Sequence, residues 1–472
     1  MTEQMPSDSA EILFFRGARC METGDAAGAE TCFREAVQIA PYFAEAYANL
    51  ALLLDKRGIA DTAEIYYRRS IELNATYSKT HLNLGALLAN QKRFSEAEEA
   101  YNRAIALCPH APAGWSNLGV LYACMKREAE AERCYRTAMS LDESYATARF
   151  NLSYLLLRQG RFEEGWRLRE ARAWFAALEA HLACPRWRGE TLAGKSILIS
   201  HEGGHGDMIQ FCRYAALLKA QGAGSITLIC HPALQTLFAE LDGVDNVISL
   251  DEQIPDSGWN FWTPLMSVPC YCNTRLDSVP AEIPYLRVPP TRIEKWAALV
   301  PKNGFRVGLV WKGSAQFEND ADRSLPSLTT LAPLWAIAGA DFISLQKGAA
   351  EDEAAHPPGG LALVNLGSRL EDFADTAAVV MSLDLVICVD TAIAHLAGAL
   401  GKPCWVLLPD YKTDWRWLAE RTDTPWYPQT MRLFRQPAMG DWDSVVAEVA
   451  AALEQLTLNS RSDTPSLSPS GG

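Results

Sequence analysis

The feature that constrains this chain most is an internal repeat of 34 residues in its first third. The dipeptide Asn-Leu recurs at this spacing, starting at Asn49, Asn83, Asn117 and Asn151. A small residue follows each copy, and the second half of each unit pairs another small residue with a large aromatic one. Small residues where two helices cross, beside large ones that fill the gaps, are what a stacked helix pair requires. The period therefore predicts a helical solenoid.

Period and pattern together resemble those of tetratricopeptide repeats, with about five units over residues 11–180. The resemblance implies an α-solenoid whose concave face binds a protein partner. The last unit is aromatic and basic from Arg161 to Phe175, where a helix that ends a solenoid is usually polar. This favours packing of its outer face on another domain, and a hydrophobic cap is the alternative.

After the repeats, short apolar runs alternate with segments of helical spacing. Residues 196–200 are predicted as the first buried parallel strand, and 306–311 open a second half with further strands. The sequence thus predicts an α + α/β protein, in which two Rossmann-like α/β domains, 193–290 and 304–457, follow the solenoid. Ligands bind such folds in the crevice at the carboxyl ends of the strands. The Ser/Pro-rich tail, 459–472, is expected to be disordered.

Composition removes several classes of function. Lys and Arg number 43 against 57 Asp and Glu, so the net charge of -14 argues against general nucleic-acid binding. We expect no membrane span and no signal peptide, because long apolar runs and a basic N-terminal segment are missing from the sequence. The twelve cysteines contain no CxxC pair, which favours reduced thiols and a cytoplasmic protein.

A glycine-rich loop follows the first predicted strand and opens a helix. Gly204 and Gly206 allow the backbone to approach a ligand at a helix N-terminus, which attracts anions. Asp207 is predicted to lie at that terminus and to face the crevice. The alternative is that Asp207 only caps the helix.

A second loop follows the first strand of the second half. Its Lys312 and Ser314 can hold a phosphate, as a point charge and a hydroxyl donor, although a solvated lysine is the alternative. Arg323 and Lys347 add cations on adjacent predicted loops.

The third loop is the most informative. A buried strand is predicted to end at Val389, and Asp390-Thr391 then open a helix of small residues that begins with Ala392. His395 lies one turn inside this helix. Free N–H groups at a helix N-terminus suit a diphosphate, while the alternative is a capping Asp390 and a packed His395.

Together the three loops resemble the heptosyltransferase-like glycosyltransferases of family 9, which have the GT-B architecture, over roughly residues 193–455. Asp390 to His395 is similar to the family's D-[ST]-x-x-x-H donor signature, and Gly206-Asp207 to its Gly-Asp pair. The resemblance implies transfer of a sugar from a nucleotide-sugar to a hydroxyl, with inversion. Asp207 would be the general base and Lys312 would bind phosphate. Ala392 departs from the family, which often has Gly there, and narrows the approach to the phosphates.

The resemblance also implies that no cofactor and no metal are needed beyond the nucleotide-sugar substrate. One DxD spacing, Asp320-Ala-Asp322, lies in a polar loop beside Arg323 and is a weak metal candidate. Arg416 lies in a tryptophan-rich stretch, where it would contact donor or acceptor or form a structural salt bridge. This stretch is similar to that of bacterial chains that fuse tetratricopeptide repeats to such a domain.

Two functions stay open from the sequence. One is a glycosyltransferase acting on a protein or glycan, with its repeats docking the acceptor or a partner. Its combination of repeats and GT-B domain resembles the O-linked N-acetylglucosamine transferases, which favours a protein acceptor. The other is a non-catalytic repeat scaffold with a degenerate sugar-nucleotide domain. A nicotinamide-dependent oxidoreductase is excluded, because the GxGxxG fingerprint is missing from the sequence.

Overall fold

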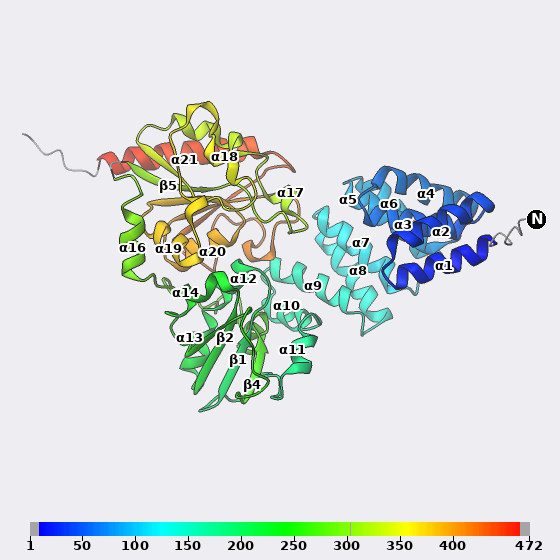
Figure 1. Ribbon diagram of the computed structural model, residues 1–472, viewed down its shortest axis with the longest axis horizontal. Helices are drawn as coiled ribbons and strands as arrows, with labels where there is room; N and C mark the ends of the chain where they lie inside the picture. Colours follow the sequence, from blue (N-terminus) through cyan, green and yellow to red (C-terminus); the bar gives the residue numbers. More distant parts are fainter. Residues whose placement is uncertain (1–8, 303, 463–472) are drawn as a thin grey trace, which may run out of the picture. The chain divides into compact units, whose positions relative to one another are not determined.

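The computed structural model describes residues 9–302 and 304–462, and its backbone contacts form two compact units (Figure 1). The first unit is Met1–Leu155 and the second is Leu156–Gly472.

The first unit is a series of antiparallel helix pairs, as the 34-residue period predicts. Its helices are α1 (Ala10–Glu22), α2 (Ala26–Ile39), α3 (Ala44–Lys56), α4 (Ala60–Leu73), α5 (Ser78–Asn90), α6 (Phe94–Leu107), α7 (Pro112–Cys124) and α8 (Glu128–Leu141), and α9 (Ala146–Arg158) crosses the boundary. The small residues are required by packing: a Cβ on Gly85 would lie 2.7 Å from the ring of Tyr101, and one on Gly119 would lie 2.7 Å from that of Tyr135. Both tyrosines are buried between the helices of their pair.

The first unit ends earlier than the predicted repeat boundary at residue 180. Helices α10 (Phe162–Arg169) and α11 (Ala176–His181) belong to the second unit. The reason is the aromatic face of α10: Phe162 and Trp166 are 2% and 1% exposed and share one core with the α/β elements. The ring centroids of Trp166 and Trp415 are 5.2 Å apart. The aromatic face therefore packs on the α/β fold.

The second unit contains two parallel sheets. The four-stranded sheet has the order β3-β2-β1-β4, and its strands are β1 (Ser196–Ser200), β2 (Ser225–Cys230), β3 (Asn246–Ser249) and β4 (Phe261–Pro264). The six-stranded sheet has the order β10-β9-β8-β5-β6-β7, and its strands are β5 (Phe305–Val310), β6 (Ala340–Ser344), β7 (Leu363–Asn365), β8 (Leu385–Val389), β9 (Cys404–Leu408) and β10 (Met431–Arg435). The strand order of the larger sheet reverses between β5 and β8. Ligands bind parallel sheets at such a reversal.

Helices connect the strands of both sheets (Figure 1). The α-helices are α12 (His205–Phe211), α13 (Tyr214–Ala220), α14 (Gln235–Phe238), α15 (Val268–Tyr271), α16 (Pro290–Ala297), α17 (Asp320–Arg323), α18 (Glu351–Ala355), α19 (Phe373–Met381), α20 (Ala392–Ala399) and α21 (Trp442–Ser462). The 3-10 turns are η1 (Pro232–Leu234), η2 (Leu265–Ser267), η3 (Leu328–Ala336), η4 (Pro358–Gly360), η5 (Gly367–Arg369) and η6 (Trp415–Trp417).

One boundary near the end of the chain differs from the sequence prediction. Helix α21 runs through Ser462, so residues 459–462 of the predicted tail are helical, because the residues Leu456 and Thr457 still pack and extend the last turns. The rest of that tail, 463–472, lies outside the described residues.

The twelve cysteines are free thiols. Within the described part of the chain, no helix is both long and apolar enough to cross a membrane.

Candidate functional site

The loops after β5 and β8 lie side by side because these strands are neighbours, with Val310 paired to Cys388. The buried side chain of Gln346, which follows β6, holds the first of these loops. Its Oε1 accepts hydrogen bonds from the backbone N–H groups of Trp311 and Lys312, each at 3.0 Å, and its Nε2 donates to the Lys312 carbonyl at 3.2 Å. The main chain of Lys312 is therefore fixed on both sides.

The N-terminus of α20 opens the second loop. Thr391 is the N-cap in an extended conformation, and its Oγ1 is buried without a hydrogen-bond partner in the described part of the chain. Burial and the Asp414 carboxylate raise the pKa of Asp390 to about 6, against the opposing charges of Arg323 and Arg416. The first amides of a helix have no partners inside the helix, so this terminus can bind an anion.

His395 is packed inside the same helix. It is 5% exposed, its Nδ1 lies 3.0 Å from the Tyr427 hydroxyl, and its ring stacks on Trp417 at a centroid distance of 5.2 Å. Burial lowers the pKa of His395 well below its usual value, and the charges of Arg416 and Arg213 act in the same direction. His395 therefore acts here as a neutral imidazole, with no charge to offer a phosphate.

Asp207 lies in the first turn of α12, and both oxygens of its carboxylate have partners. One carboxylate oxygen accepts from the Gly204 N–H at 2.7 Å, as a helix cap does. The other forms an ion pair with Arg416. Arg416 is 6% exposed, and it also bonds Gln210 at 2.6 Å and Asp414 at 3.0 Å. Arg416 thus forms salt bridges that join the two sheets' domains.

The glycine-rich loop and the donor-signature helix meet at Gly206. A Cβ on Gly206 would lie 2.9 Å from the His395 ring and 3.3 Å from Cα of Ala392. The two helix N-termini are therefore in direct contact, and a side chain at 206 would separate them. This contact brings Asp207, Arg416 and the start of α20 together.

Two other predicted site residues, Ser314 and Lys347, do not point to a phosphate site in the structure. Ser314 is exposed, and its Oγ accepts from the Gln316 N–H at 3.4 Å. Lys347 donates to the Leu370 carbonyl at 2.6 Å, so this ammonium is committed to the backbone.

Arg323 pairs with Asp320 at 3.2 Å and lies over the Phe317 ring at 4.2 Å.

Within residues 9–302 and 304–462, no group of three or more His, Cys, Asp or Glu side chains is placed to hold a metal ion. That the reaction needs no metal or cofactor stays a prediction.

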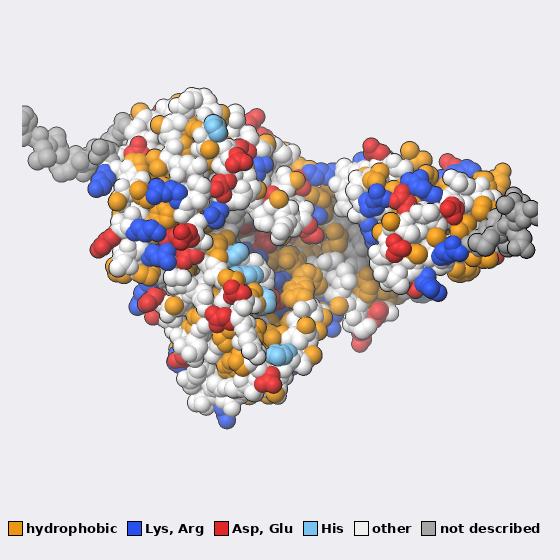
Figure 2. Space-filling view, in the orientation of Figure 1, with side chains coloured by type: hydrophobic (Ala, Val, Ile, Leu, Met, Phe, Trp, Pro, Cys, Tyr) orange, Lys and Arg blue, Asp and Glu red, His pale blue; other side chains and the backbone are white. Residues whose placement is uncertain are grey.

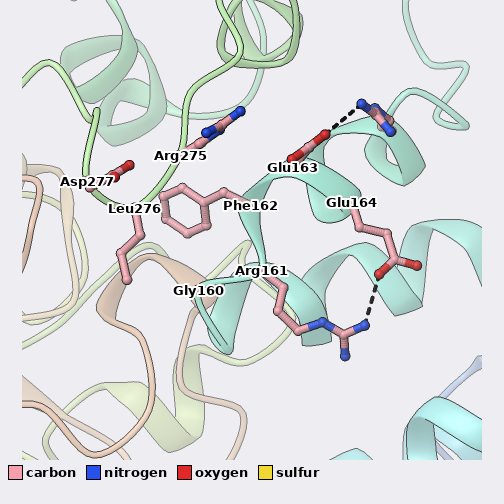
Figure 3. Close-up of a pocket in the computed structure, with 9 residues that line it drawn as sticks. Gly160, Arg161, Phe162, Glu163, Glu164, Arg275, Leu276 and Asp277 are labelled. Carbon is pink, nitrogen blue, oxygen red and sulfur yellow. Dashed lines mark hydrogen bonds and ion pairs between the residues drawn. The ribbon is translucent and has the colours of Figure 1, made fainter.

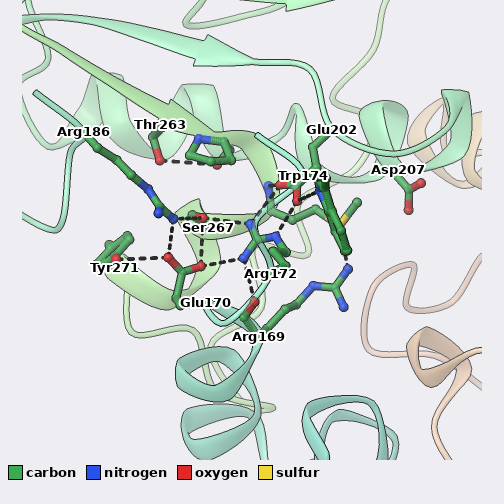
Figure 4. Close-up of polar contacts among 12 residues, drawn as sticks. Arg169, Glu170, Arg172, Trp174, Arg186, Glu202, Asp207, Thr263, Ser267 and Tyr271 are labelled. Carbon is green, nitrogen blue, oxygen red and sulfur yellow. Dashed lines mark hydrogen bonds and ion pairs between the residues drawn. The ribbon is translucent and has the colours of Figure 1, made fainter. Parts of the chain in front are cut away.

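A buried ionic network behind Asp207 was not predicted from the sequence (Figure 4). Glu202 is 3% exposed and accepts hydrogen bonds from Arg172, from Trp174 Nε1 at 2.8 Å and from the Met266 N–H at 3.0 Å. Burial alone would raise the pKa of Glu202, but the hydrogen bonds and charge of Arg172 lower it. Arg172 also pairs with Glu170 at 2.7 Å. The partners lie about 30 residues apart in sequence, so local patterns do not reveal them.

Three histidines, His201, His205 and His231, lie near one another after the strands β1 and β2. Figure 2 shows histidine side chains grouped on one face of the molecule. The ring centroids of His201 and His231 are 5.8 Å apart, and those of His205 and His231 are 4.7 Å apart. Burial and the neighbouring His231 lower the pKa of both His201 and His205. Neutral imidazoles of this kind can exchange hydrogen bonds with hydroxyl groups.

A cavity of about 910 Å³ lies apart from these loops, between α10 and the segment after α15 (Figure 3). Four of its charged side chains form ion pairs with one another: Arg161 contacts Glu164 at 2.9 Å, and Arg167 contacts Glu163 at 2.8 Å. None of the predicted site residues lines this cavity.

Comparison with known proteins agrees with this architecture. The profile of glycosyltransferase family 9 (heptosyltransferase) matches residues 343–407, which contain the donor-signature helix. Tetratricopeptide repeat profiles match residues 44–77, 78–111 and 113–145. The N-terminal region therefore carries tetratricopeptide repeats, and a glycosyltransferase family 9 domain follows them.

Among curated proteins, Protein FlbA of Caulobacter vibrioides is 27% identical over 339 residues, which is 66% of this chain and 55% of that protein. The chain thus matches about half the length of this relative. Among solved structures, MamA is 21% identical with a TM-score of 0.30 and covers 34% of this chain and 92% of its own. Pseudomonas aeruginosa pilF is 22% identical with a TM-score of 0.33 and covers 35% of this chain and 77% of its own.

Proposed function

We propose that the protein is a glycosyltransferase that moves a sugar from a nucleotide-sugar to a hydroxyl group, with inversion at the anomeric carbon. The observation that carries this proposal is the contact between α12 and α20 at Gly206. It joins the residues expected to bind the donor with the carboxylate expected to act on the acceptor. The family 9 match over residues 343–407 supports the donor half.

The donor diphosphate would bind at the start of α20. The first amides of that helix and the buried Thr391 hydroxyl offer hydrogen bonds, and the Lys312 ammonium offers a positive charge. Gln346 fixes the Lys312 main chain, so the backbone from which this side chain extends is held in place before the donor arrives. Negative charge that develops on the leaving diphosphate is stabilised by groups of this kind without reorganisation.

Asp207 would act on the acceptor. Its carboxylate takes the proton of the acceptor hydroxyl, the oxygen forms a bond to the anomeric carbon, and the bond from that carbon to the diphosphate breaks. Arg416 and the Gly204 N–H orient the carboxylate. The acceptor is a glycan or a protein, and the repeats dock either this acceptor or a protein partner on their concave face.

The test is a calorimetric titration with the nucleoside diphosphates of adenine, guanine, uracil, cytosine and thymine. We expect saturable binding of one of them, weakened about tenfold or more in Lys312→Ala and Asp390→Ala. Lys56→Ala is the matched control, because Lys56 is an exposed residue of α3. If none of the five nucleotides binds, the chain is a non-catalytic scaffold.

A further inference from the structure

Trp174 is unusual among the tryptophans of this chain in being both exposed and anchored. Its side chain is 57% exposed, yet its indole N–H donates to the Glu202 carboxylate at 2.8 Å. Large aromatic side chains are normally buried, and those that are exposed and held in place commonly serve recognition. The proposed mechanism gives Trp174 no role.

The anchor of Trp174 is rigid. Glu202 accepts two hydrogen bonds from Arg172, one of them at 2.9 Å, and Arg172 itself is 4% exposed. The Arg172 guanidinium also donates to the Arg169 carbonyl at 3.0 Å and to Ser267 at 2.8 Å. Burying charges is costly, so such a network fixes a geometry more than it adds stability. A side chain held in this way loses little entropy when a ligand binds.

Contacts of Glu202 and Met266 connect this aromatic group with the loop that carries the proposed base. The Met266 backbone N–H bonds Glu202, and the Met266 sulfur lies 3.9 Å from Arg416 Nη2. A Cβ at Gly203 would overlap the Asp207 carboxylate and lie 2.7 Å from the Met266 methyl group. Figure 4 shows Trp174 and Glu202 within the polar network and Asp207 to one side of it.

The charges around the indole balance, which indicates the kind of ligand. Three arginines and four carboxylates form ion pairs here: Arg172 with Glu170 and Glu202, Arg186 with Glu170, and Arg416 with Asp207 and Asp414. The charge of a fourth arginine, Arg169, also lowers the pKa of Glu202, while its Nη2 lies 3.0 Å from the Met266 sulfur. A paired, neutral setting favours a neutral ligand over a cationic or an anionic one. His201, next to Glu202, has a buried Nδ1 without a hydrogen-bond partner in the described part of the chain, and so can bond a hydroxyl.

We propose that Trp174 is the acceptor platform, whose indole face stacks on a sugar ring of a glycan acceptor and brings a hydroxyl of that ring to Asp207. A pyranose has an apolar C–H face and a rim of hydroxyls, which fits an exposed indole face whose anchor, Glu202, follows His201 in the chain. The proposal rests on the proposed function, since it names the acceptor of that same site. It favours a glycan over a protein as the acceptor.

The test uses the full chain labelled with 5-fluorotryptophan, with the Trp174 resonance assigned by its loss in Trp174→Phe. Methyl glycosides of glucose, galactose, mannose, N-acetylglucosamine and rhamnose are titrated at millimolar concentrations. We expect one of them to shift the Trp174 resonance of the unmodified chain. Its affinity for the variants is measured from the resonances of the glycoside itself, and we expect it to be weakened about tenfold in Trp174→Ala and kept within a few fold in Trp174→Phe. The control is Trp115→Ala, because the Trp115 indole bonds the Pro109 carbonyl within the repeats.

Nucleoside diphosphate binding is measured on the same samples and separates the two proposals. We expect it to be the same in both Trp174 variants and in the unmodified chain. If a nucleotide binds but none of the glycosides shifts Trp174, the acceptor platform is refuted and the proposed function stands. A shift caused by a peptide rich in serine and threonine, and by none of the sugars, also refutes the glycan. If no nucleotide binds, the proposed function itself fails.

Discussion

Replacing Glu202 by glutamine tests the buried network directly. The substitution keeps the size of the side chain and removes the charge that Arg172 neutralises. Both partners are nearly inaccessible to water, since the Arg172 and Glu202 side chains are 0% and 2% exposed. Removing one partner of such a pair leaves the other charge buried without compensation, which typically costs about 3–5 kcal/mol. Glu170 still pairs with Arg172 at 2.7 Å, so we expect the lower end of this range.

The assay is differential scanning calorimetry at neutral pH. For a unit as large as Leu156–Gly472, a loss of about 3 kcal/mol lowers the midpoint by about 4–5 °C. Glu163→Gln is the matched control. It breaks the Arg167–Glu163 pair of α10, whose side chains are 70% and 60% exposed, and such surface pairs contribute little.

The pH dependence gives a second check. The pKa of Glu202 is lowered in the folded protein, so its contribution to stability is fully present above the unfolded pKa of about 4.3. That contribution is lost as the pH falls through the lowered value. The difference between the unmodified chain and Glu202→Gln should therefore shrink below about pH 4. A midpoint in Glu202→Gln no lower than that of Glu163→Gln at neutral pH would refute the reasoning.

Three further predictions concern other parts of the chain. Gly85→Ala places a Cβ 2.7 Å from the Tyr101 ring and should cost about 1–3 kcal/mol, so that only the calorimetric transition of the repeats shifts. Gln346→Ala removes the hydrogen bonds that fix the Lys312 main chain and should weaken nucleotide binding about five- to tenfold in the titration, whereas an unchanged affinity would contradict the positioning role. Asp390→Asn should raise stability at pH 8, on the order of 1–2 kcal/mol, because the pKa of about 6 makes the native carboxylate costly when charged. The native carboxyl becomes protonated as the pH falls, so this gain should fade towards pH 5, and an equal gain at both pH values would contradict the assignment.

Local patterns were enough to predict the helix pairs and most strands. Gly85 and Gly119 mark helix crossings because only a hydrogen fits against the tyrosine rings there, and that demand recurs in the sequence with the period of the structure. The loops after β1, β5 and β8 could also be predicted, because each follows an apolar strand that ends at glycine or polar residues. Ligands bind parallel sheets at these carboxyl ends of the strands.

Contacts between distant segments could not be predicted in this way. The strand β10 went unnoticed because Arg432 and Arg435 interrupt its apolar pattern, although it completes the edge of the larger sheet. Lys347 resembles a phosphate ligand in sequence, but its ammonium donates to the Leu370 carbonyl. The pairing of Arg172 with Glu202 joins a segment that looked like a repeat and linker to a loop that looked like a ligand-binding turn.

That pairing limits how the chain can be divided or recombined. A fragment that begins at residue 193, where the apolar strands start, keeps Glu202 but lacks Arg172, and it also lacks the tryptophan of α10 that completes the core. The glycosyltransferase half therefore includes helix α10 and the segment that follows it, although both look like repeat sequence. An exchange of repeat arrays between related chains would preserve folding only if the junction fell before α10, so this helix is inherited with the α/β part and not with the array that it resembles.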